Sequence, residues 1–385
     1  MIPEFLDFSM RTRVMGSVGL VRELGDQVTR LGVRRAFIVS DRNLNQVGLV
    51  ERAKEGLAAG GVAVVGEFLD VPPNSDVAVV ERAAAAATAA GGDVLVAIGG
   101  GSVIDTAKGM NMVLSKGGNL MDYQGLGLVN EPLGKLVAVP TTAGTGSEVT
   151  NMAVIKDPGA RIKYSFTSPY LGPDLAVLDP EMTLGLPPGL TASTGMDALT
   201  HAIEAYLSTS ANPISDGLAL HAVRVINQWL PRATHEGSNV EARYWMLIGS
   251  NLAGAAFSNA LVGCVHAMAH ALGGLFDVPH GLANAILLAP GLEYNLDVAA
   301  SRIAELAPSF RVQPAGSDEE TARAVVAAVK ALAQGCGLPA RLRDAGVPEG
   351  GLREAAEAAA MDGAIFTNPR PATPEELLEV LAKAY

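Results

Sequence analysis

The chain has 385 residues, of which 49% are hydrophobic, and it carries a formal net charge of −12 at pH 7. This length is enough for two or three domains, and the hydrophobic fraction is enough for a large buried core. The acidic balance argues against nucleic acid and anionic membranes as partners, because both bind basic protein surfaces.

The N-terminal segment and the cysteine content indicate a cytoplasmic protein. Residues 1–7 contain no basic segment followed by an apolar run, so we expect no signal peptide. Two cysteines, Cys264 and Cys336, are too few for a disulfide framework. We therefore expect free thiols inside the cell.

The first half of the chain alternates strand-like and helix-like patterns. Runs rich in strand-forming residues lie at 36–40, 62–68, 94–98 and 136–139, with helical patterns at 44–59 and 77–90. This alternation predicts a parallel sheet with crossover helices, extended by strand-like runs at 152–156, 162–166 and 176–178. The first fourteen residues, which include Phe5, Phe8 and Val14, are predicted as an edge strand, either of this sheet alone or at a dimer interface.

Two loops rich in glycine and hydroxyl side chains follow buried strands. The first is Gly99-Gly100-Gly101-Ser102, which leads into a helical run at 103–108, and the second spans residues 140–148. Consecutive glycines allow a close approach of the backbone to a ligand, and the following helix N-terminus offers N–H groups to an anion. A lone glycine triplet is often only a turn. Two such loops at strand carboxyl ends predict dinucleotide binding.

Asp41 follows the predicted strand at 36–40. An acid at this position can bind an adenosine ribose diol and repel a 2′-phosphate, which favours NAD over NADP, but it can equally be a plain helix N-cap. In a standard Rossmann domain this acid follows the glycine loop, whereas Asp41 precedes it. The sequence therefore predicts a variant of the Rossmann fold.

The composition changes near residue 181. Asp179-Pro180 and the segment 186–190 act as breaks, and the remaining chain shows helical periodicity to its end. We predict an α/β dinucleotide-binding domain at 1–181 and an all-helical domain at 182–385. Residues 244–276 contain no Asp, Glu, Lys or Arg, yet they include polar side chains and histidines. A buried helix pair around a polar site explains this segment better than a membrane span does.

The histidines of the chain are concentrated in its second half, at 201, 221, 235, 266, 270 and 280. Asp197 and His201 are four residues apart, as are His266 and His270, so each pair projects from one face of a helix. Asp197, His201, His266 and His280 form an oxygen and nitrogen donor set that suits iron(II) or zinc. This set predicts a metal site with those four ligands.

Other residues of this region have plainer interpretations. His221 and His235 are predicted to be ordinary surface or core histidines, and Cys264, two residues before His266, points away from it on a helix. The segment His266-Ala267-Met268-Ala269-His270 is not a zincin motif, because alanine follows the first histidine where the general-base glutamate belongs.

The whole chain closely resembles the iron-containing (group III) alcohol dehydrogenase family. Three motifs carry this resemblance: Gly99-Gly100-Gly101-Ser102-Val103-Ile104-Asp105-Thr106-Ala107-Lys108, the stretch 179–204, and the stretch 263–281 with its three histidines. The resemblance implies a dehydroquinate synthase-like fold, with a dinucleotide-binding domain, a helical metal-binding domain and a site in the cleft between them. It also implies the four metal ligands Asp197, His201, His266 and His280.

The resemblance assigns further roles residue by residue. His270 matches a histidine near the substrate but outside the metal ligands, Phe257 matches a position lining the alcohol pocket, and Asn151 falls near the nicotinamide. Cofactor contacts are implied for the residues Asp41, Asn74, Gly99, Gly100, Gly101, Ser102, Asp105, Thr141, Thr142, Thr145, Ser147 and Lys163.

The expected reaction is NAD(H)-linked hydride transfer between nicotinamide C4 and a small alcohol bound to a divalent metal. A metal with an open position lowers the pKa of the alcohol, and one Asp with three neutral His leaves a positive site that favours an alkoxide. Family resemblance favours iron, although the ligands alone also allow zinc. We expect His270 to relay a proton, a small alcohol or aldehyde as substrate, and a homodimer or higher homo-oligomer.

Several related functions remain alternatives. Dehydroquinate synthase uses the same fold on an anionic substrate, which needs several basic residues, but residues 181–290 contain no Lys and only Arg224, Arg232 and Arg243. Glycerol dehydrogenase typically binds its metal with fewer histidines, and maleylacetate reductase is expected to lack this full ligand set. A metal-binding protein without catalysis would leave both glycine loops unused. Which alcohol is the substrate, and in which direction the enzyme works, stay open.

Overall fold

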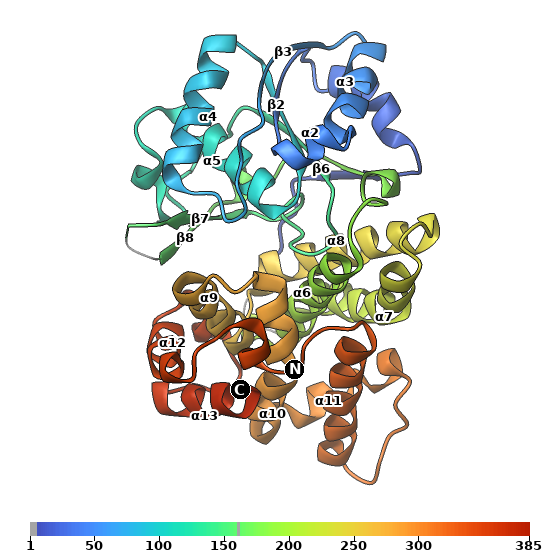
Figure 1. Ribbon diagram of the computed structural model, residues 1–385, viewed down its shortest axis with the longest axis vertical. Coiled ribbons are helices and arrows are strands. Elements are labelled where there is room, and N and C mark those ends of the chain that lie inside the picture. The colour runs from blue at the N-terminus through green and yellow to red at the C-terminus, as the bar shows by residue number, and fades with distance from the viewer. Residues whose placement is uncertain (1–5, 160–161) are drawn as a thin grey trace. The chain divides into compact units, whose positions relative to one another are not determined.

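The α/β pattern of the first half forms a parallel sheet in a computed structural model, which describes residues 6–159 and 162–385 (Figure 1). Six strands pair in parallel in the order β1-β9-β6-β4-β2-β3. In that order their bounds are Arg13–Gly16, Leu175–Leu178, Lys135–Pro140, Val94–Gly99, Arg35–Val39 and Ala63–Phe68. Strand β4 lies inside the sheet between β6 and β2, so the loop after it starts from the centre of the sheet's carboxyl edge.

Alternate residues of β4 explain how the sheet is stabilised on both faces. Val96 and Ile98 pack into one hydrophobic cluster, while Leu95 and Ala97 pack into the other. Such burial on both faces is typical of parallel sheets covered by crossover helices. The covering helices are α1 (Leu24–Thr29), α3 (Leu49–Ala59), α4 (Val77–Ala90) and α5 (Gly101–Lys116), and the short helix α2 (Arg42–Gln46) packs on α3.

A smaller sheet completes the α/β unit. Its strands are β5 (Gly125–Leu126), β8 (Ile162–Thr167) and β7 (Met152–Asp157), with β8 parallel to β5 and antiparallel to β7. Residues 9–142 and 146–185 form this unit by their contacts. The parallel sheet with helices confirms the predicted α/β fold of the N-terminal part.

Two local predictions in this unit were imprecise. The helical pattern at 44–59 is broken, because Gly48 has a φ of 80° between α2 and α3. The predicted edge strand is β1, which begins only at Arg13, because its partner β9 offers four residues for pairing. Residues 6–12 form no strand, and Phe5 lies outside the described residues.

The second unit is helical. It comprises residues 186–385, with 143–145 and the described residues 6–8. Its α-helices are α6 (Pro188–Leu207), α7 (Pro213–His235), α8 (Val240–Ala260), α9 (Cys264–Phe276), α10 (His280–Ala304), α11 (Asp318–Gly335), α12 (Leu352–Ala360) and α13 (Pro374–Ala384). Short 3-10 helices complete the chain at Leu20–Glu23, Leu120–Tyr123, Pro169–Leu171, Pro180–Met182, Ala307–Phe310, Leu342–Ala345, Glu349–Gly351 and Gly363–Thr367.

Helix α6 is the centre of the helical unit. From Thr191 to Leu207 its side chains are buried on every face except at Thr194. It packs against α7, α8 and α10. A helix buried on all sides lies in the core of a protein, and polar residues on such a helix need partners within the protein.

Helices α8 and α9 contain the long stretch without charged side chains. They are bent by 102° at a short break, where Leu261 has a φ of 63°. Among the described helices, none is by itself long and apolar enough to cross a membrane, and only this bent pair meets the length and composition test when taken together.

Candidate functional site

Two of the predicted metal ligands lie one turn apart on the buried helix α6. Asp197 is 2% exposed and His201 is 5% exposed. The helix starts at Pro188, and proline at a first helical position costs no hydrogen bond. Because i and i+4 side chains share one face of a helix, both residues point the same way.

The other two ligands stand in the first turns of α9 and α10. His266 follows the sharp turn that ends α8, and His280 is the first residue of α10, after Pro279. His266 is 2% exposed. The turn at Leu261 and the helix start at His280 bring both imidazoles to the face of α6 that carries Asp197.

The four side chains meet at one point. One donor atom from each lies within 4.8 Å of the others. Oδ1 of Asp197 is 3.4 Å from Nε2 of His280, 3.8 Å from Nε2 of His266 and 4.0 Å from Nδ1 of His201. Adjacent donors that would bind one cation at about 2.1 Å lie about 3 to 3.4 Å apart. This spacing matches a site that closes on a cation with small movements.

The state of His201 also fits a metal ligand. Its burial, together with His266 and His270, holds the pKa of His201 well below its ordinary value, so the ring is neutral at pH 7. Its Nδ1 is buried and has no hydrogen-bond partner among the described residues. A neutral imidazole with an unused buried nitrogen is what a divalent cation requires. The ring of Phe257 stacks on His201 at 4.2 Å and shields this side.

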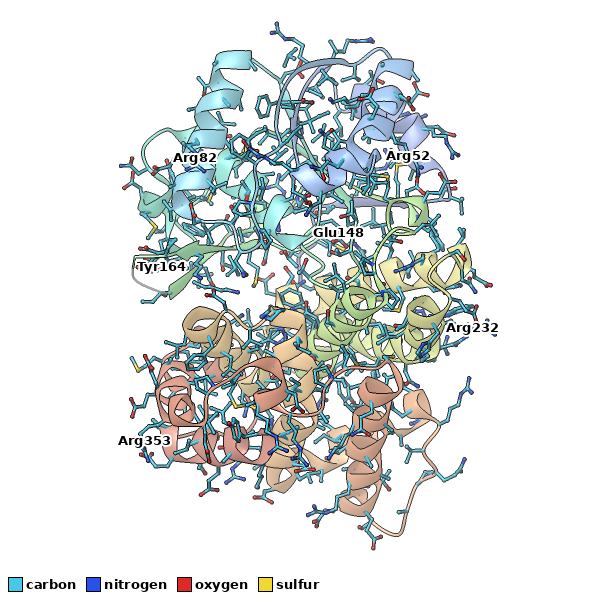
Figure 2. The ribbon with its side chains drawn as sticks, in the orientation of Figure 1. Arg52, Arg82, Glu148, Tyr164, Arg232 and Arg353 are labelled. Carbon is cyan, nitrogen blue, oxygen red and sulfur yellow. The ribbon has the colours of Figure 1, made fainter. Side chains whose placement is uncertain are left out.

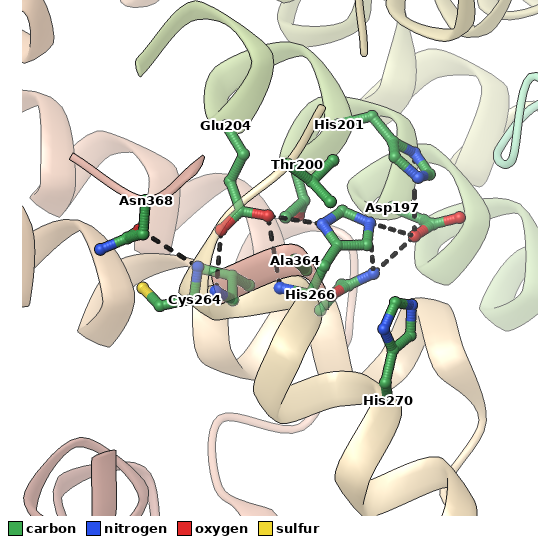
Figure 3. A network of polar contacts seen from close by, with 12 residues as sticks. Asp197, Thr200, His201, Glu204, Cys264, His266, His270, Ala364 and Asn368 are labelled. Carbon is green, nitrogen blue, oxygen red and sulfur yellow. Dashed lines mark hydrogen bonds and ion pairs between the residues drawn. The ribbon is translucent and has the colours of Figure 1, made fainter. Parts of the chain in front are cut away.

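His266 is held by a carboxylate that the sequence did not single out. Nδ1 of His266 lies 2.5 Å from Oε2 of Glu204, which is also on α6 (Figure 3). Burial alone lowers the pKa of His266, but the hydrogen bond and the charge of Glu204, with the charge of Asp197, outweigh it and raise the pKa. Glu204 is three residues after His201 and seven after Asp197, a spacing that places it on their side of the helix.

Asn284 is a second residue that sequence reasoning missed. It is fully buried on α10, one turn after His280. Its side-chain nitrogen lies 2.6 Å from Oδ1 of Asp197, 3.2 Å from Nε2 of His280 and 3.3 Å from Nε2 of His266. The amide therefore contacts three of the four donor atoms, and its i+4 spacing from His280 was the available signal.

His270 lies beside the ligand set and has its own partner. Its ring stacks on His280 at 5.3 Å, and its Nδ1 lies 3.0 Å from Oδ2 of Asp362. Burial alone raises the pKa of Asp362, but the charge and hydrogen bond of His270 outweigh it and hold the pKa below its usual range. Asp362 precedes the 3-10 helix Gly363–Thr367, and no sequence spacing connects it with His270.

The arginines between Glu181 and Pro290 serve other purposes. Arg243 is buried and donates to Gly237 O, Thr191 Oγ1 and Leu186 O. Arg232, labelled in Figure 2, is exposed and lies over the ring of Trp229. Arg224 is exposed on α7. None of the three contacts a ligand of the candidate metal site.

His221, His235 and Cys264, which were predicted to lie outside the metal site, are placed as follows. His221 is exposed, and Nε2 of His235 lies 2.9 Å from Gly335 O. Cys264 is a buried thiol, and burial raises its pKa far above the ordinary value. Cys264 is not among the described residues whose donor atoms converge on the candidate metal site.

The first glycine loop joins β4 to α5 in the α/β unit. Gly100 is the N-cap of α5 and contributes no side chain, and a Cβ there would lie 3.0 Å from Oγ1 of Thr142. The backbone N–H of Asn74, which has a φ of 53°, donates to Oγ of Ser102. Four of the predicted cofactor residues therefore meet at the N-terminus of α5, where backbone N–H groups favour an anion.

Asp105 and Lys108 fasten the second loop to α5. Asp105 accepts from Val154 N and from Oγ of Ser147. Lys108 is fully buried, and its Nζ donates to Thr150 O, Thr150 Oγ1 and Met152 O. Burial lowers the pKa of Lys108 to about 8 and raises that of Asp105. Both side chains are thus engaged within the protein, which makes them supports of the loop.

The other predicted cofactor residues are placed as follows. Asp41 is the N-cap of α2 and accepts from Leu44 N, at the carboxyl end of β2, which neighbours β4. The backbone N–H of Thr141 donates to Gly99 O. Lys163 is on β8, Asn151 precedes β7, and Thr145 belongs by its contacts to the helical unit.

Gly144, beside Thr145, packs closely on the start of α6. A Cβ on Gly144 would lie 2.8 Å from Cβ of Thr194 and 3.0 Å from its carbonyl oxygen. The Gly144 backbone also interacts with His201, and this contact only partly opposes the lowering of the His201 pKa by burial. Only glycine allows this approach, which ties the second glycine loop to a candidate ligand.

Comparisons with known proteins cover both halves of the chain. Residues 11–180 match the family model "Iron-containing alcohol dehydrogenase", and residues 191–385 match "Fe-containing alcohol dehydrogenase family, C-terminal". The chain is 39% identical to a 1,3-propanediol dehydrogenase of Klebsiella pneumoniae over 94% of each chain. It is 38% identical to a lactaldehyde reductase of Escherichia coli K12, over 95% of this chain and 96% of that one. A crystal structure of a 1,3-propanediol oxidoreductase has a TM-score of 0.96 at 38% identity, and covers 99% of this chain and 100% of its own.

Proposed function

Because the chain belongs to the iron-containing alcohol dehydrogenase family, we propose that it interconverts a short alcohol and its aldehyde with NAD(H). The class is that of an NAD-dependent, metal-dependent oxidoreductase acting on CH–OH groups. The observation that carries the proposal is the convergence of Asp197, His201, His266 and His280 from three helices on one point. Hydride passes between the alcohol carbon and nicotinamide C4, the position where the cofactor gives or accepts it.

We assign the four converging side chains to a resident divalent metal, with iron(II) preferred over zinc by family membership. When bound, such a cation polarises the oxygen of an alcohol or a carbonyl and favours loss of the alcohol proton. The chain's own part is to hold three imidazoles and one carboxylate in place and to keep water away. The burial of Asp197, His201 and His266 and the cover of Phe257 support this role.

We assign NAD(H) to the α/β unit, within the domain proposed at 1–181, and the metal to the helical domain at 182–385. The N-terminus of α5 and the adjoining hydroxyl side chains suit the pyrophosphate, and we assign Asp41, the N-cap of α2, to the adenosine ribose. The proposed contacts are Asp41, Asn74, Gly99, Gly100, Gly101, Ser102, Thr141, Thr142, Thr145 and Lys163. Asp105 and Ser147 act in this proposal by supporting the second loop.

His270 is proposed to relay a proton between the alcohol and solvent. The ring stacks on His280 and is 21% exposed at its side chain, so it reaches both the metal site and the surface. Asp362 fixes its Nδ1, which leaves Nε2 for the substrate side of the relay. We therefore assign to His270 the role of holding and moving the proton.

The proposed substrate is a short alcohol without strong charge. The described residues near the ligands provide no arginine for an anionic substrate, since Arg243 is engaged inside the helical unit. The similar proteins named for 1,3-propanediol and lactaldehyde favour a three-carbon diol or hydroxyaldehyde. Phe257 is proposed to line the alcohol pocket and Asn151 to lie near the nicotinamide.

Assembly and location are further parts of the proposal. We propose a homodimer or a higher homo-oligomer, for which β1, at the edge of the six-stranded sheet, is the candidate contact. We also propose the cytoplasm, where NAD(H) is available and where the free thiols of Cys264 and Cys336 stay reduced. Size-exclusion chromatography with light scattering tests the first point.

A panel of short alcohols and aldehydes tests the function. The purified chain is stripped with a chelator, reloaded with iron(II) or zinc, and assayed with NAD(H). We expect the enzyme to be active on a short alcohol. The chelator should abolish this activity, iron(II) should restore it better than zinc, and exposure to air should remove it. Failure to bind NAD(H) in a fluorescence titration would contradict the proposal.

A further inference from the structure

Glu204 joins the two helices that carry three of the four candidate metal ligands. It lies on α6, is 5% exposed, and reaches the first turn of α9 (Figure 3). Its carboxylate lies 2.5 Å from Nδ1 of His266, and it accepts from Val265 N at 2.7 Å and from His266 N at 3.3 Å. Nothing in the expected reaction uses this buried carboxylate directly.

The contact determines which nitrogen of His266 carries hydrogen. A carboxylate only accepts hydrogen bonds, so Nδ1 of His266 must donate. In the neutral ring Nε2 then keeps its lone pair, and this nitrogen faces Oδ1 of Asp197 at 3.8 Å. The amide nitrogen of Asn284, a donor, lies 3.3 Å from the same Nε2. Both neighbours agree with Nε2 as the nitrogen available to a metal.

The same carboxylate determines where α9 begins. Gly263 precedes the helix and has no side chain to cap it, so the first N–H groups need acceptors from elsewhere. Glu204 supplies two of them, and a negative charge at a helix N-terminus is stabilising. A Cβ on Gly263 would lie 3.0 Å from Oε1 of Glu204, which explains the glycine. Through this cap Glu204 places His266 relative to α6.

We propose that Glu204 is a positioning residue of the metal site. It holds His266 in the Nδ1–H form and raises the basicity of the ligating nitrogen, as carboxylates behind metal-bound histidines do. It touches neither the substrate nor the position between the four donors. The inference rests on the proposed function, because it requires a metal at Asp197, His201, His266 and His280.

The substitution Glu204→Gln tests the proposal by metal affinity. The variant and the wild type are titrated with cobalt(II) and iron(II) against a chelator, without substrate or NAD(H). We expect affinity to fall about 10- to 100-fold, with an altered visible spectrum of the cobalt form. Unchanged affinity and an unchanged spectrum would overturn the proposal.

Asp179→Asn is the matched control. Asp179 is fully buried, and its carboxylate accepts from Gly19 N, Val21 N and Glu181 N, but it contacts no candidate ligand. Both variants lose stability, and only Glu204→Gln is expected to lose metal affinity. An equal loss of metal affinity in both variants would overturn the proposal, because the lower affinity would then follow from destabilisation alone.

A measurement on the wild type covers the case in which Glu204→Gln does not fold. Nitrogen-15 labelling of the six histidines in the zinc-loaded protein shows which ring nitrogen carries hydrogen. We expect His266 to keep hydrogen on Nδ1, and a ring protonated at Nε2 would overturn the inference. A wild-type chain without metal affinity would instead overturn the proposed function, and this inference with it.

Discussion

Nδ1 of His270 lies 3.0 Å from Oδ2 of Asp362, and the two side chains are 21% and 26% exposed. The pair joins α9 to the segment before the 3-10 helix Gly363–Thr367. If His270 relays the proton, His270→Ala lowers kcat about 100-fold or more, the usual contribution of general acid–base catalysis. Asp362→Asn lowers it less, because it keeps the ring but weakens its orientation. An unchanged pH–rate profile in His270→Ala would exclude the relay.

The pair of His270 and Asp362 also predicts how the free energy of unfolding depends on pH. The pKa of Asp362 is held below its ordinary value of 3.8 by His270. A lowered carboxylate pKa contributes stability that is present above the unfolded pKa and lost as the pH falls through the folded one. We expect Asp362→Asn to reduce the difference in unfolding free energy between about pH 6 and pH 3. Denaturant unfolding of the wild type and the variant across this pH range measures that difference. If the unfolding free energy depends on pH identically in both proteins, the lowered pKa of Asp362 would be contradicted.

Asn284→Leu separates metal binding from folding. The amide nitrogen of Asn284 contacts Asp197 at 2.6 Å, while its Oδ1 is buried without a hydrogen-bond partner among the described residues. Leucine has a similar size and removes that unsatisfied oxygen, which offsets part of the stability lost with the donor to Asp197. Metal affinity is expected to fall about 10-fold, because Asp197 loses its orienting donor. A variant that is unstable but binds metal normally would make Asn284 a core residue only.

Lys108→Met tests the support under the second glycine loop. It leaves Thr150 O and Met152 O without their donor and leaves Asp105 without its buried counter-charge. We expect a loss of about 3–5 kcal/mol of stability and weaker NAD(H) binding. The control Lys116→Met, on the same helix, removes only an ion pair with the exposed Glu131, so a much smaller loss of stability is expected.

The buried ammonium also gives a pH signature. The pKa of Lys108 falls from 10.5 to about 8 on folding, so between these values the unfolded chain binds more protons. The contribution of Lys108 to the free energy of unfolding therefore increases with pH between these two values. The variant Lys108→Met should not show this increase. Urea unfolding from about pH 8 to pH 10 measures it. Parallel curves for wild type and variant would contradict the shift.

Phe257→Ala tests the proposed pocket. The ring stacks on His201 at 4.2 Å, so its removal opens space beside a candidate ligand. We expect kcat/KM for a four-carbon alcohol to rise about 10-fold relative to a three-carbon one, the discrimination that one methylene provides. Metal content serves as the control, because the loss of stacking on His201 must not explain the result. An unchanged ratio would remove Phe257 from the pocket.

Local patterns predicted much of this structure. The alternation of strands and helices, the two glycine loops and the i, i+4 spacing of Asp197 and His201 are properties of short segments. The chemistry of the donor set joined His266 and His280 to them, and the resemblance of whole motifs implied the same four ligands. The family and the fold class were confirmed in this way.

The supporting residues could not be predicted, because they depend on tertiary structure. Glu204 reaches His266 only because the chain turns at Leu261, and a positive φ at leucine leaves no sequence signal. Asp362 meets His270 across 92 residues. The break at Gly48 overrode a helical pattern that periodicity treated as continuous. For Glu204 and Asp362 the decisive contact lies outside the segment whose pattern was read, whereas at Gly48 a single positive φ inside the segment broke the pattern.

The central claim is that Asp197, His201, His266 and His280 hold one iron ion. Crystals grown without oxygen and with iron(II) allow an anomalous difference map at the iron absorption edge. We predict a single strong peak at bonding distance from Oδ1 of Asp197 and one nitrogen of each histidine. A peak elsewhere, or none at these residues in crystals of active enzyme, would contradict the account.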